Sequence, residues 1–223
     1  MAQVAADLRG PWFRVELRSS WATALLYRAP SVPVVWALVR LGVSPLAVSL
    51  IGLLLALSMP LQALNLPVGI AAVTVALSGM MFQVLDCADG ILARVTDRTS
   101  KLGGDVDTLI DLTQWGLLYL SVGLLADATL DTGLFWTASA AVAAWARLLA
   151  RVIRDRLDDG IEATPRPLRL AQYPSAFIAG ISGLIPLLAL TGPWMGTAVC
   201  ALVVYSLLDV AEALVPLVRA LRE

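Results

Sequence analysis

Long apolar stretches constrain this chain more than any other feature of its sequence. A helix needs about 20 mainly apolar residues to cross the hydrocarbon core of a bilayer, and six windows of this kind follow one another here, separated by short breaks. The windows cover residues 45–64, 67–85, 104–126, 133–150, 173–190 and 193–215. Because 59% of the residues are hydrophobic and only 15% are charged, a water-soluble globule is excluded. We predict an all-α polytopic membrane protein with six transmembrane helices.

The positive charges agree with this division of the chain. If the six windows alternate across the bilayer, all 16 Lys and Arg residues fall on one side, which the positive-inside rule assigns to the cytoplasm. The three loops on the other side contain neither Lys nor Arg. This distribution predicts an integral protein of the cell membrane whose N-terminus, C-terminus and candidate active site are cytoplasmic.

The segment ahead of the first window has a different character. Residues 31–41 are mainly apolar, end with Arg40 and Leu41, and are stopped by Gly42 and Pro45, so we expect a short amphipathic helix in the membrane interface. The first 30 residues lack the uninterrupted apolar core of a signal peptide, and we expect them to stay on the mature protein. We therefore divide the chain into an interfacial segment 1–44, a six-helix transmembrane domain 45–218 that carries the candidate catalytic residues, and a cytoplasmic tail 219–223.

The charge balance and the residue types exclude several functions. The formal net charge is −1, which gives no basic field for binding nucleic acid. The chain contains no His, so proton transfer falls to carboxylates rather than to imidazole. Cys87 and Cys200 lie far apart in apolar surroundings, which predicts two buried thiols rather than a disulfide framework.

Four aspartates stand at the cytoplasmic ends of the second and third windows, where a buried carboxylate is costly unless it is paired or metal-bound. Asp86 and Asp89 are three residues apart and Asp107 and Asp111 are four apart, so each pair projects from one face of a helix. A short connection lets both pairs meet. Carboxylates without His or Cys select hard cations such as Mg²⁺ or Mn²⁺, and four of them can hold two ions. The alternative is that these aspartates cap helices or are solvated in a charged loop.

Small residues and one arginine accompany the acids. Gly90, Ala93 and Gly103 each lie four residues from one of the aspartates, which leaves room for a bulky ligand beside the carboxylates. Small residues also serve ordinary helix packing in membranes. Arg94 lies one turn from Gly90 and suits a phosphate oxygen, or alternatively anchors the helix on the cytoplasmic side.

Written as a pattern, Asp86-x2-Asp89-Gly90-x2-Ala93-Arg94-x8-Gly103-x3-Asp107-x3-Asp111 resembles the signature of the CDP-alcohol phosphotransferases at every specified position. Residues 40–52 also resemble the segment that leads into the first span of that family, and they depart from it at Leu46, where many members have Asn or Asp. The resemblance implies six spans, cytoplasmic termini and a homodimer.

The resemblance also implies a reaction. A phosphatidyl-type group would pass from a CDP-linked lipid, commonly CDP-diacylglycerol, to the hydroxyl of a second alcohol, and CMP would be released. Asp86, Asp89, Asp107 and Asp111 would ligate two Mg²⁺ or Mn²⁺ ions, and Asp111 would also be the general base. The residues that match donor-binding positions are Ser49, Gly90, Ala93, Arg94, Ser100 and Gly103.

The identity of the acceptor is less constrained. Candidate acceptor contacts are Arg151, Arg154, Arg166 and Arg169. Part of this set resembles an Arg-Pro-x-Arg element of phosphoinositol-transferring members, which would make the protein specific for a phosphoinositol or glycerophosphate acceptor. The same arginines could instead anchor the protein to anionic membrane lipids. Asp209 and Glu212 on the last window are expected to pair with one of the arginines.

Two functions of other classes compete with the transferase. Carboxylates inside a membrane also mark ion pathways, so the protein could be a divalent-cation transporter, although the outer halves of the windows contain no charged relay. A catalytically silent membrane scaffold is the second, and the intact spacing of the four aspartates disfavours it.

Overall fold

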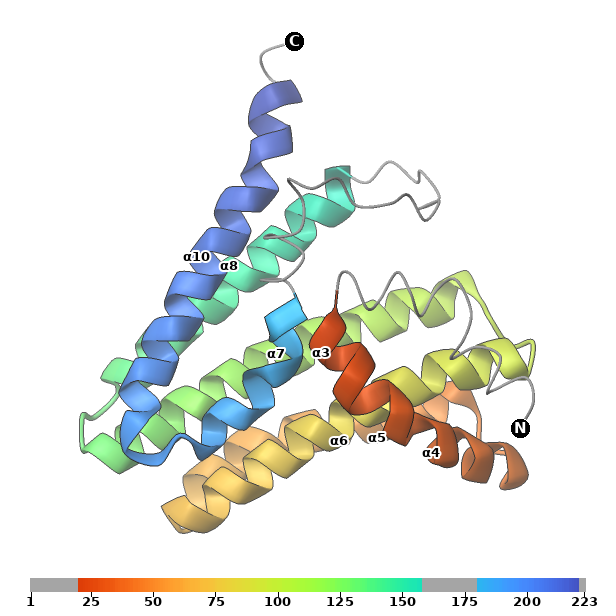
Figure 1. Cartoon of the computed structure of the whole chain (residues 1–223), viewed down its shortest axis with the longest axis horizontal. Coiled ribbons are helices and arrows are strands. Elements are labelled where there is room, and N and C mark those ends of the chain that lie inside the picture. The colour runs from red at the N-terminus through yellow and green to blue at the C-terminus, as the bar shows by residue number, and fades with distance from the viewer. Residues whose placement is uncertain (1–19, 158–179, 221–223) are drawn as a thin grey trace. The chain divides into compact units, whose positions relative to one another are not determined.

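The computed structural model describes residues 20–157 and 180–220, and within these ranges every element is helical. The elements are α3 (Trp21–Thr23), η1 (Ala24–Arg28), α4 (Ala29–Arg40), α5 (Pro45–Asn65), α6 (Val68–Val95), α7 (Lys101–Leu130), α8 (Phe135–Leu157), η3 (Ile181–Leu190), η4 (Gly192–Trp194) and α10 (Met195–Ala220) (Figure 1). For this part of the chain the predicted all-α class is confirmed.

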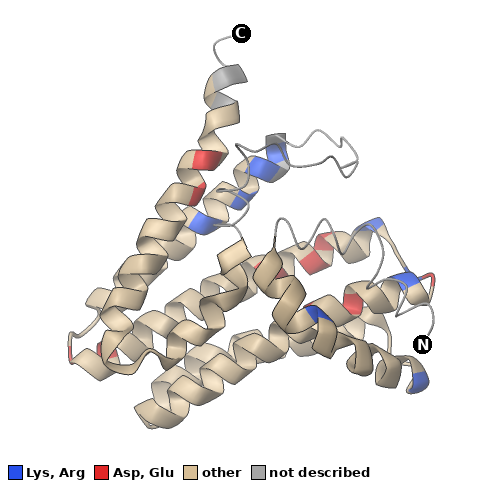
Figure 2. Ribbon diagram, viewed as in Figure 1, with Lys and Arg blue, Asp and Glu red and all other residues tan. Residues whose placement is uncertain are grey.

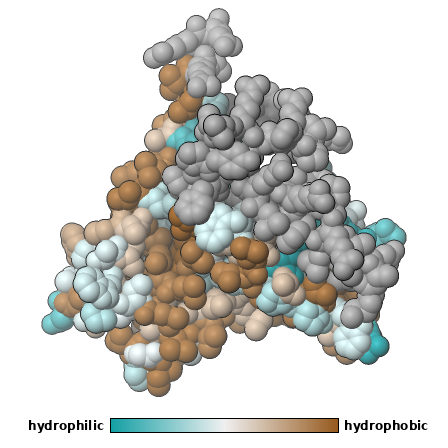
Figure 3. Space-filling view, viewed as in Figure 1, coloured by the Kyte–Doolittle hydropathy of each residue, from teal (hydrophilic) through white to brown (hydrophobic). Residues whose placement is uncertain are grey.

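Five of the described helices are long and apolar enough to cross a membrane: Trp21–Arg40, Pro45–Asn65, Val68–Val95, Lys101–Leu130 and Gly192–Pro216. Large apolar side chains are exposed along them. On α5, a stripe at helical spacing consists of Leu50, Leu54, Leu57, Leu61 and Leu64. Figure 3 shows hydrophobic side chains over much of the visible described surface. Apolar exposure of this extent suits contact with lipid rather than water, as expected of an integral membrane protein.

The N-terminal helix differs from the prediction. α3, η1 and α4 follow one another as a single helix of 20 residues, long enough to cross a membrane, whereas the sequence predicted a short interfacial helix over 31–41. In the structure the helix instead widens to a π-helical turn at Ala24–Arg28, directly ahead of Pro30, because proline cannot donate the regular backbone hydrogen bond.

The fourth and fifth predicted windows also differ from expectation. α8 does not meet the length and hydropathy criterion for a span, since four arginines fall in its second half. The window at 173–190 begins outside the described residues, and the part within them contains the short apolar helix η3. A total of six crossings therefore stays a prediction.

Contacts within the chain divide it into two compact units, each assembled from separated segments. The first comprises residues 1–58, 77–111 and 164–186, and the second comprises residues 59–76, 112–163 and 187–223. The sequence suggested one transmembrane domain over 45–218, but α5, α6 and α7 each contribute residues to both units. All four candidate metal-binding aspartates belong to the first unit.

In the first unit, a hydrophobic cluster fixes one face of α6. Ala88, Ile91 and Leu92 of α6 are buried together with Val35 of α4 and Val48 of α5. Because successive residues of a helix are about 100° apart, this contact leaves the opposite face of α6 for the aspartates and small residues of the motif.

In the second unit, α8 and α10 pack side by side with charged residues facing one another (Figures 1 and 2). Asp209 of α10 accepts hydrogen bonds from Arg147 at 2.8 Å and from Arg154 at 2.5 Å, and Glu212 lies 3.7 Å from Arg154. The predicted pairing of Asp209 and Glu212 with an arginine is confirmed.

Asp127, near the end of α7, holds the start of α8 in the same unit. Its carboxylate accepts hydrogen bonds from Thr132 Oγ1 at 2.7 Å and from the backbone N–H of Trp136 at 3.0 Å. It also accepts from the N–H and the hydroxyl of Thr137, at 2.8 and 2.6 Å. One side chain therefore closes the turn between the helices and satisfies N–H groups in the first turn of α8.

Candidate metal centre and adjoining cavity

A short turn brings the two acidic pairs together. α6 ends at Val95 and α7 begins at Lys101. Asp97 in the turn has a φ of 52°, which aspartate adopts more readily than most residues. The N–H of Arg98 donates to the carbonyl of Ala93 at 2.9 Å. The turn reverses the chain so that the end of α6 meets the start of α7.

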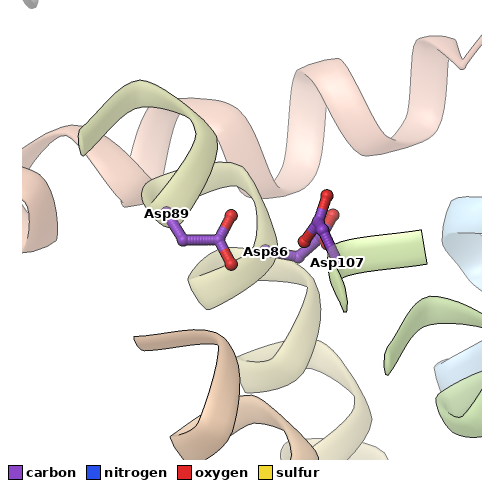
Figure 4. A group of neighbouring side chains, drawn as sticks. All are labelled: Asp86, Asp89 and Asp107. Carbon is purple, nitrogen blue, oxygen red and sulfur yellow. The ribbon is translucent and has the colours of Figure 1, made fainter. Parts of the chain in front are cut away.

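Three carboxylates form a compact group at this meeting point. Asp86 and Asp89 of α6 and Asp107 of α7 each offer an oxygen, and these oxygens lie within 4.8 Å of one another. Figure 4 shows the three side chains converging from the two helices. Asp89 is only 6% exposed, and the other two are half-buried. Oxygen-only ligands at this spacing fit a hard divalent cation, which would also relieve the repulsion among them.

Asp111 adjoins this group without being part of it. It lies one turn after Asp107 on α7, and its carboxylate lies close enough to that of Asp86 for the two charges to repel each other. The sequence predicted a site of four carboxylates. The structure has three close carboxylates and a fourth that contacts one of them, so the roles of Asp111 as ligand and base stay predictions.

Ser49 connects α5 to this group. Its hydroxyl donates to Oδ2 of Asp89 at 2.5 Å and also lies 3.2 Å from the carbonyl oxygen of Pro45. A hydroxyl has one proton, and the shorter contact with the carboxylate is the stronger one. Ser49 was predicted as a donor contact, and the structure adds that it orients a candidate metal ligand.

A cavity of about 400 Å³ opens beside the carboxylates. All six residues predicted to contact the donor line it: Ser49, Gly90, Ala93, Arg94, Ser100 and Gly103. Asp89 and Asp107 are also in its wall. The lining comes from α5, α6, α7 and the turns that precede α5 and α7, and the volume is that of a small-molecule site. The motif residues therefore share one cavity with the candidate metal ligands.

Two helices begin at this cavity. Ser44 and Ser100, both in its wall, accept hydrogen bonds from the N–H groups of Ala47 at 3.2 Å and Gly103 at 3.0 Å, and so cap α5 and α7. Helix N-termini carry partial positive charge and attract anions. Because Arg94 and Arg98 are also in the wall, the cavity suits phosphate groups.

The structure also distinguishes the two interpretations of the small residues. A Cβ built on Gly90 would have Arg94 Nη1 as its nearest neighbour, at 3.5 Å, and would meet no other helix. At Gly52, by contrast, a Cβ would contact the ring of Phe82 on the neighbouring helix at 3.4 Å. Gly90 therefore borders open space, as expected beside a ligand, rather than a tight helix crossing.

Of the predicted acceptor contacts, Arg151 and Arg154 lie on α8 in the second unit, and Arg154 is paired with Asp209. Arg166 and Arg169 lie outside the described residues. Contact of these four arginines with an acceptor stays a prediction.

Sequence reasoning missed other residues of the site. Ser44, Arg98 and Thr99 line the cavity, and the four-residue spacing from Arg94 to Arg98 was the available signal for one of them. The prediction of two buried thiols is wrong, because Cys87 is half-buried and Cys200 is exposed.

No protein-family model matches the chain, and no curated protein matches it either. The resemblance to the CDP-alcohol phosphotransferases therefore rests on the sequence motifs alone.

Proposed function

We propose that the protein is a divalent-metal-dependent CDP-alcohol phosphotransferase of phospholipid biosynthesis. It transfers a phosphatidyl-type group from CDP-diacylglycerol to an alcohol acceptor and releases CMP. One observation carries the proposal. The six residues that the motif assigns to the donor, although spread over three helices and a turn, line a single cavity together with two of the aspartates.

The diphosphate of the donor is the part that this cavity accommodates best. The capped starts of α5 and α7 and the guanidinium groups of Arg94 and Arg98 supply hydrogen-bond donors to phosphate oxygens. Leu46 and Leu102, also in the wall, are 52% and 73% exposed and suit acyl chains that remain in the bilayer. Divalent ions held by the aspartates would neutralise the diphosphate and stabilise departing CMP.

The transfer exchanges one phosphorus–oxygen bond for another. The acceptor hydroxyl oxygen forms a bond to the phosphorus that carries the diacylglycerol, and the bond from that phosphorus to the bridging oxygen breaks. The bridging oxygen leaves with CMP and keeps the electron pair. The hydroxyl proton passes to the carboxylate of Asp111, which acts as general base in a chain that contains no His.

The distribution of Lys and Arg supports a cytoplasmic position for the site and for both termini. CDP-linked donors carry a polar nucleotide on a lipid, so a site at the membrane surface lets the nucleotide reach the aspartates while the lipid stays in the bilayer. The active form is a homodimer, as the resemblance implies.

The test is an assay with the purified full chain in lipid vesicles. CDP-diacylglycerol and Mg²⁺ are supplied with serine, inositol, glycerol 3-phosphate or inositol 1-phosphate, CMP is measured by chromatography, and the lipid product is identified by mass. Asp107→Asn should abolish CMP release. Asp105→Asn, a change two positions away at an exposed side chain, should not.

Absence of CMP with every acceptor, from protein that remains folded, would overturn the proposal. Uptake of Mn²⁺ into the same vesicles without CMP release would favour the divalent-cation transporter instead.

A further inference from the structure

The first part of the N-terminal helix borders a second cavity beside the aspartate group. This cavity has a volume of about 200 Å³. Its described lining comes from two elements that face each other: Ser20, Thr23, Ala24 and Arg28 at the start of the N-terminal helix, and Asp86, Cys87, Gly90 and Arg94 of α6. The spacing within each set is that of one helix face. Since Asp86 is a candidate metal ligand, movement of the N-terminal helix away from α6 would expose the aspartate group.

The later part of the same helix is fixed to α6 by apolar packing. Val35 of α4 is fully buried in a cluster with Ala88, Ile91 and Leu92 of α6. Val32 and Leu38 pack against this cluster. The helix therefore has an anchored part after residue 31, whereas residues 20–28 face α6 across the second cavity.

The helix is easiest to bend between these two parts. Pro30 and Pro33 lack an N–H group, so two backbone hydrogen bonds are missing from this stretch. The π-helical turn Ala24–Arg28 comes directly before them. Bends in helices occur mostly at prolines and at π-helical turns. A hinge at Pro30 and Pro33 would move residues 20–28 and leave the apolar anchor in place.

The segment 180–183 holds the first part of the helix in position. The hydroxyl of Tyr27 donates to the carbonyl of Gly183 at 2.7 Å, in a buried contact between residues 156 positions apart. A Cβ on Gly183 would lie 2.7 Å from the backbone nitrogen of Thr23, and a Cβ on Gly180 would overlap the ring of Trp21. The two glycines therefore permit a close approach that a side chain would prevent.

We infer that residues 20–28 form a lid over the second cavity, hinged at Pro30 and Pro33 and latched by the segment 180–183. The lid is closed in the structure and limits access to Asp86 and Cys87. Local opening of this kind costs less free energy than unfolding of the whole protein, because only the contacts of the latch are broken. Lids that open and close over a site commonly turn at a few hinge residues.

The role of the lid rests on the proposed function. If water reached the donor, its oxygen would form the bond to phosphorus that the acceptor oxygen otherwise forms. The bridging oxygen would leave with CMP and keep the electron pair, one proton of the water would pass to a carboxylate of the site, and phosphatidate would be the product. A closed lid keeps water from consuming the donor in this way.

Alkylation of Cys87 measures the opening of the lid without turnover. In a Cys200→Ser background Cys87 is the only thiol of the chain, and its reaction with N-ethylmaleimide in the purified full chain is followed by mass. When a lid opens and closes rapidly, the rate of reaction follows the open population. Tyr27→Phe removes the hydrogen bond of the latch and should speed alkylation about 2- to 10-fold.

A second variant opens the lid by a different route. Gly183→Ala places a Cβ against Thr23 and should speed alkylation of Cys87 about 10-fold or more, the usual effect of an overpacked contact. Gly69→Ala is the matched control, because a Cβ there would meet nothing within 4 Å, and it should leave the rate unchanged. A bulky maleimide should gain more from opening than methyl methanethiosulfonate does, whereas a change in thiol reactivity alone would affect both reagents equally.

A disulfide tests the closed state. Thr23 Oγ1 would lie 2.9 Å from a Cβ at position 183, which is within reach of a disulfide. The double variant Thr23→Cys with Gly183→Cys should cross-link on oxidation, as peptide mapping would show. Oxidised protein should alkylate more slowly at Cys87 than the same protein after reduction with dithiothreitol.

Three results would each overturn the lid. These are unchanged alkylation in Tyr27→Phe and Gly183→Ala, equal acceleration with the bulky and the small reagent, and equal alkylation of Cys87 in the oxidised and reduced double variant.

The lid and the proposed function can fail separately. In vesicles that contain CDP-diacylglycerol and Mg²⁺ but no acceptor, Gly183→Ala should form more phosphatidate than the unmodified protein. Faster alkylation of Cys87 in variants of a protein that releases no CMP with any acceptor would refute the transferase and leave the lid. CMP release with an acceptor, in a protein whose alkylation does not respond to the latch variants, would refute the lid and leave the transferase.

Discussion

Replacing Ser49 by alanine tests whether the aspartate group is a metal centre held in position by α5. The hydroxyl of Ser49 donates to Asp89 Oδ2 at 2.5 Å, and hydrogen bonds to charged groups contribute about 1.5–3 kcal/mol. Since about 1.4 kcal/mol is a factor of ten, removing the bond should weaken metal binding by about 10- to 100-fold, the range typical of residues that orient a metal ligand. The α-helix itself should persist, because alanine is a strong helix former.

The assay is Mn²⁺ binding followed by the loss of the free-ion electron paramagnetic resonance signal, and it requires no turnover. Ser139→Ala is the matched control. Like Ser49, Ser139 lies near the carbonyl oxygen four residues earlier, to which its hydroxyl donates at 2.9 Å. Unlike Ser49, it has no hydrogen bond to a carboxylate among the described residues. An apparent dissociation constant for Ser49→Ala within twofold of the unmodified protein would refute the argument that Ser49 orients Asp89 for a metal.

Three further outcomes follow from the structure. Asp111→Asn should lower the rate of CMP release at least 100-fold, which is the smallest effect usual for the loss of a general base. Binding of CDP-diacylglycerol, measured by dialysis, should persist in this variant. A normal rate of CMP release would reject Asp111 as the base. Excess EDTA should stop CMP release and added Mg²⁺ should restore it, whereas activity that survives chelation would exclude a metal-dependent reaction. Asp127→Ala removes the hydrogen bonds that start α8 and should cost about 2 kcal/mol or more of stability. Its thermal unfolding midpoint in detergent should fall below that of Asp131→Asn, a neighbouring exposed acid.

The sequence predicted those parts of the molecule that local spacing determines. Residues three or four apart on a helix share a face, so Asp86 and Asp89 were expected to act together, and the short turn after α6 brought Asp107 to them. The succession of long apolar windows was enough to predict the helical class. The pairing of Asp209 with an arginine was also predictable, because a charge in an apolar helix requires a partner.

Other features depend on how helices rotate and pack, which spacing does not specify. The contact between Ser49 and Asp89 joins residues 40 positions apart and needs a particular rotation of α5 against α6. Arg28 carried the same charge signal as any cation flanking a span, and its spacing in the sequence does not reveal that it is buried. The predicted helix began only at residue 31, whereas the described helix begins at Trp21 and passes through a π-helical turn ahead of Pro30, which spacing alone does not indicate.

The contacts of α8 with α10 bear on how the chain folds during synthesis. A buried arginine is costly without its counter-charge, and the counter-charge of Arg147 is Asp209, which lies 62 residues further along. When α8 leaves the ribosome its partner has not yet been made. We therefore expect α8 to pack into place only after α10 has been made, which makes the end of translation the step that commits this half of the protein to its final fold.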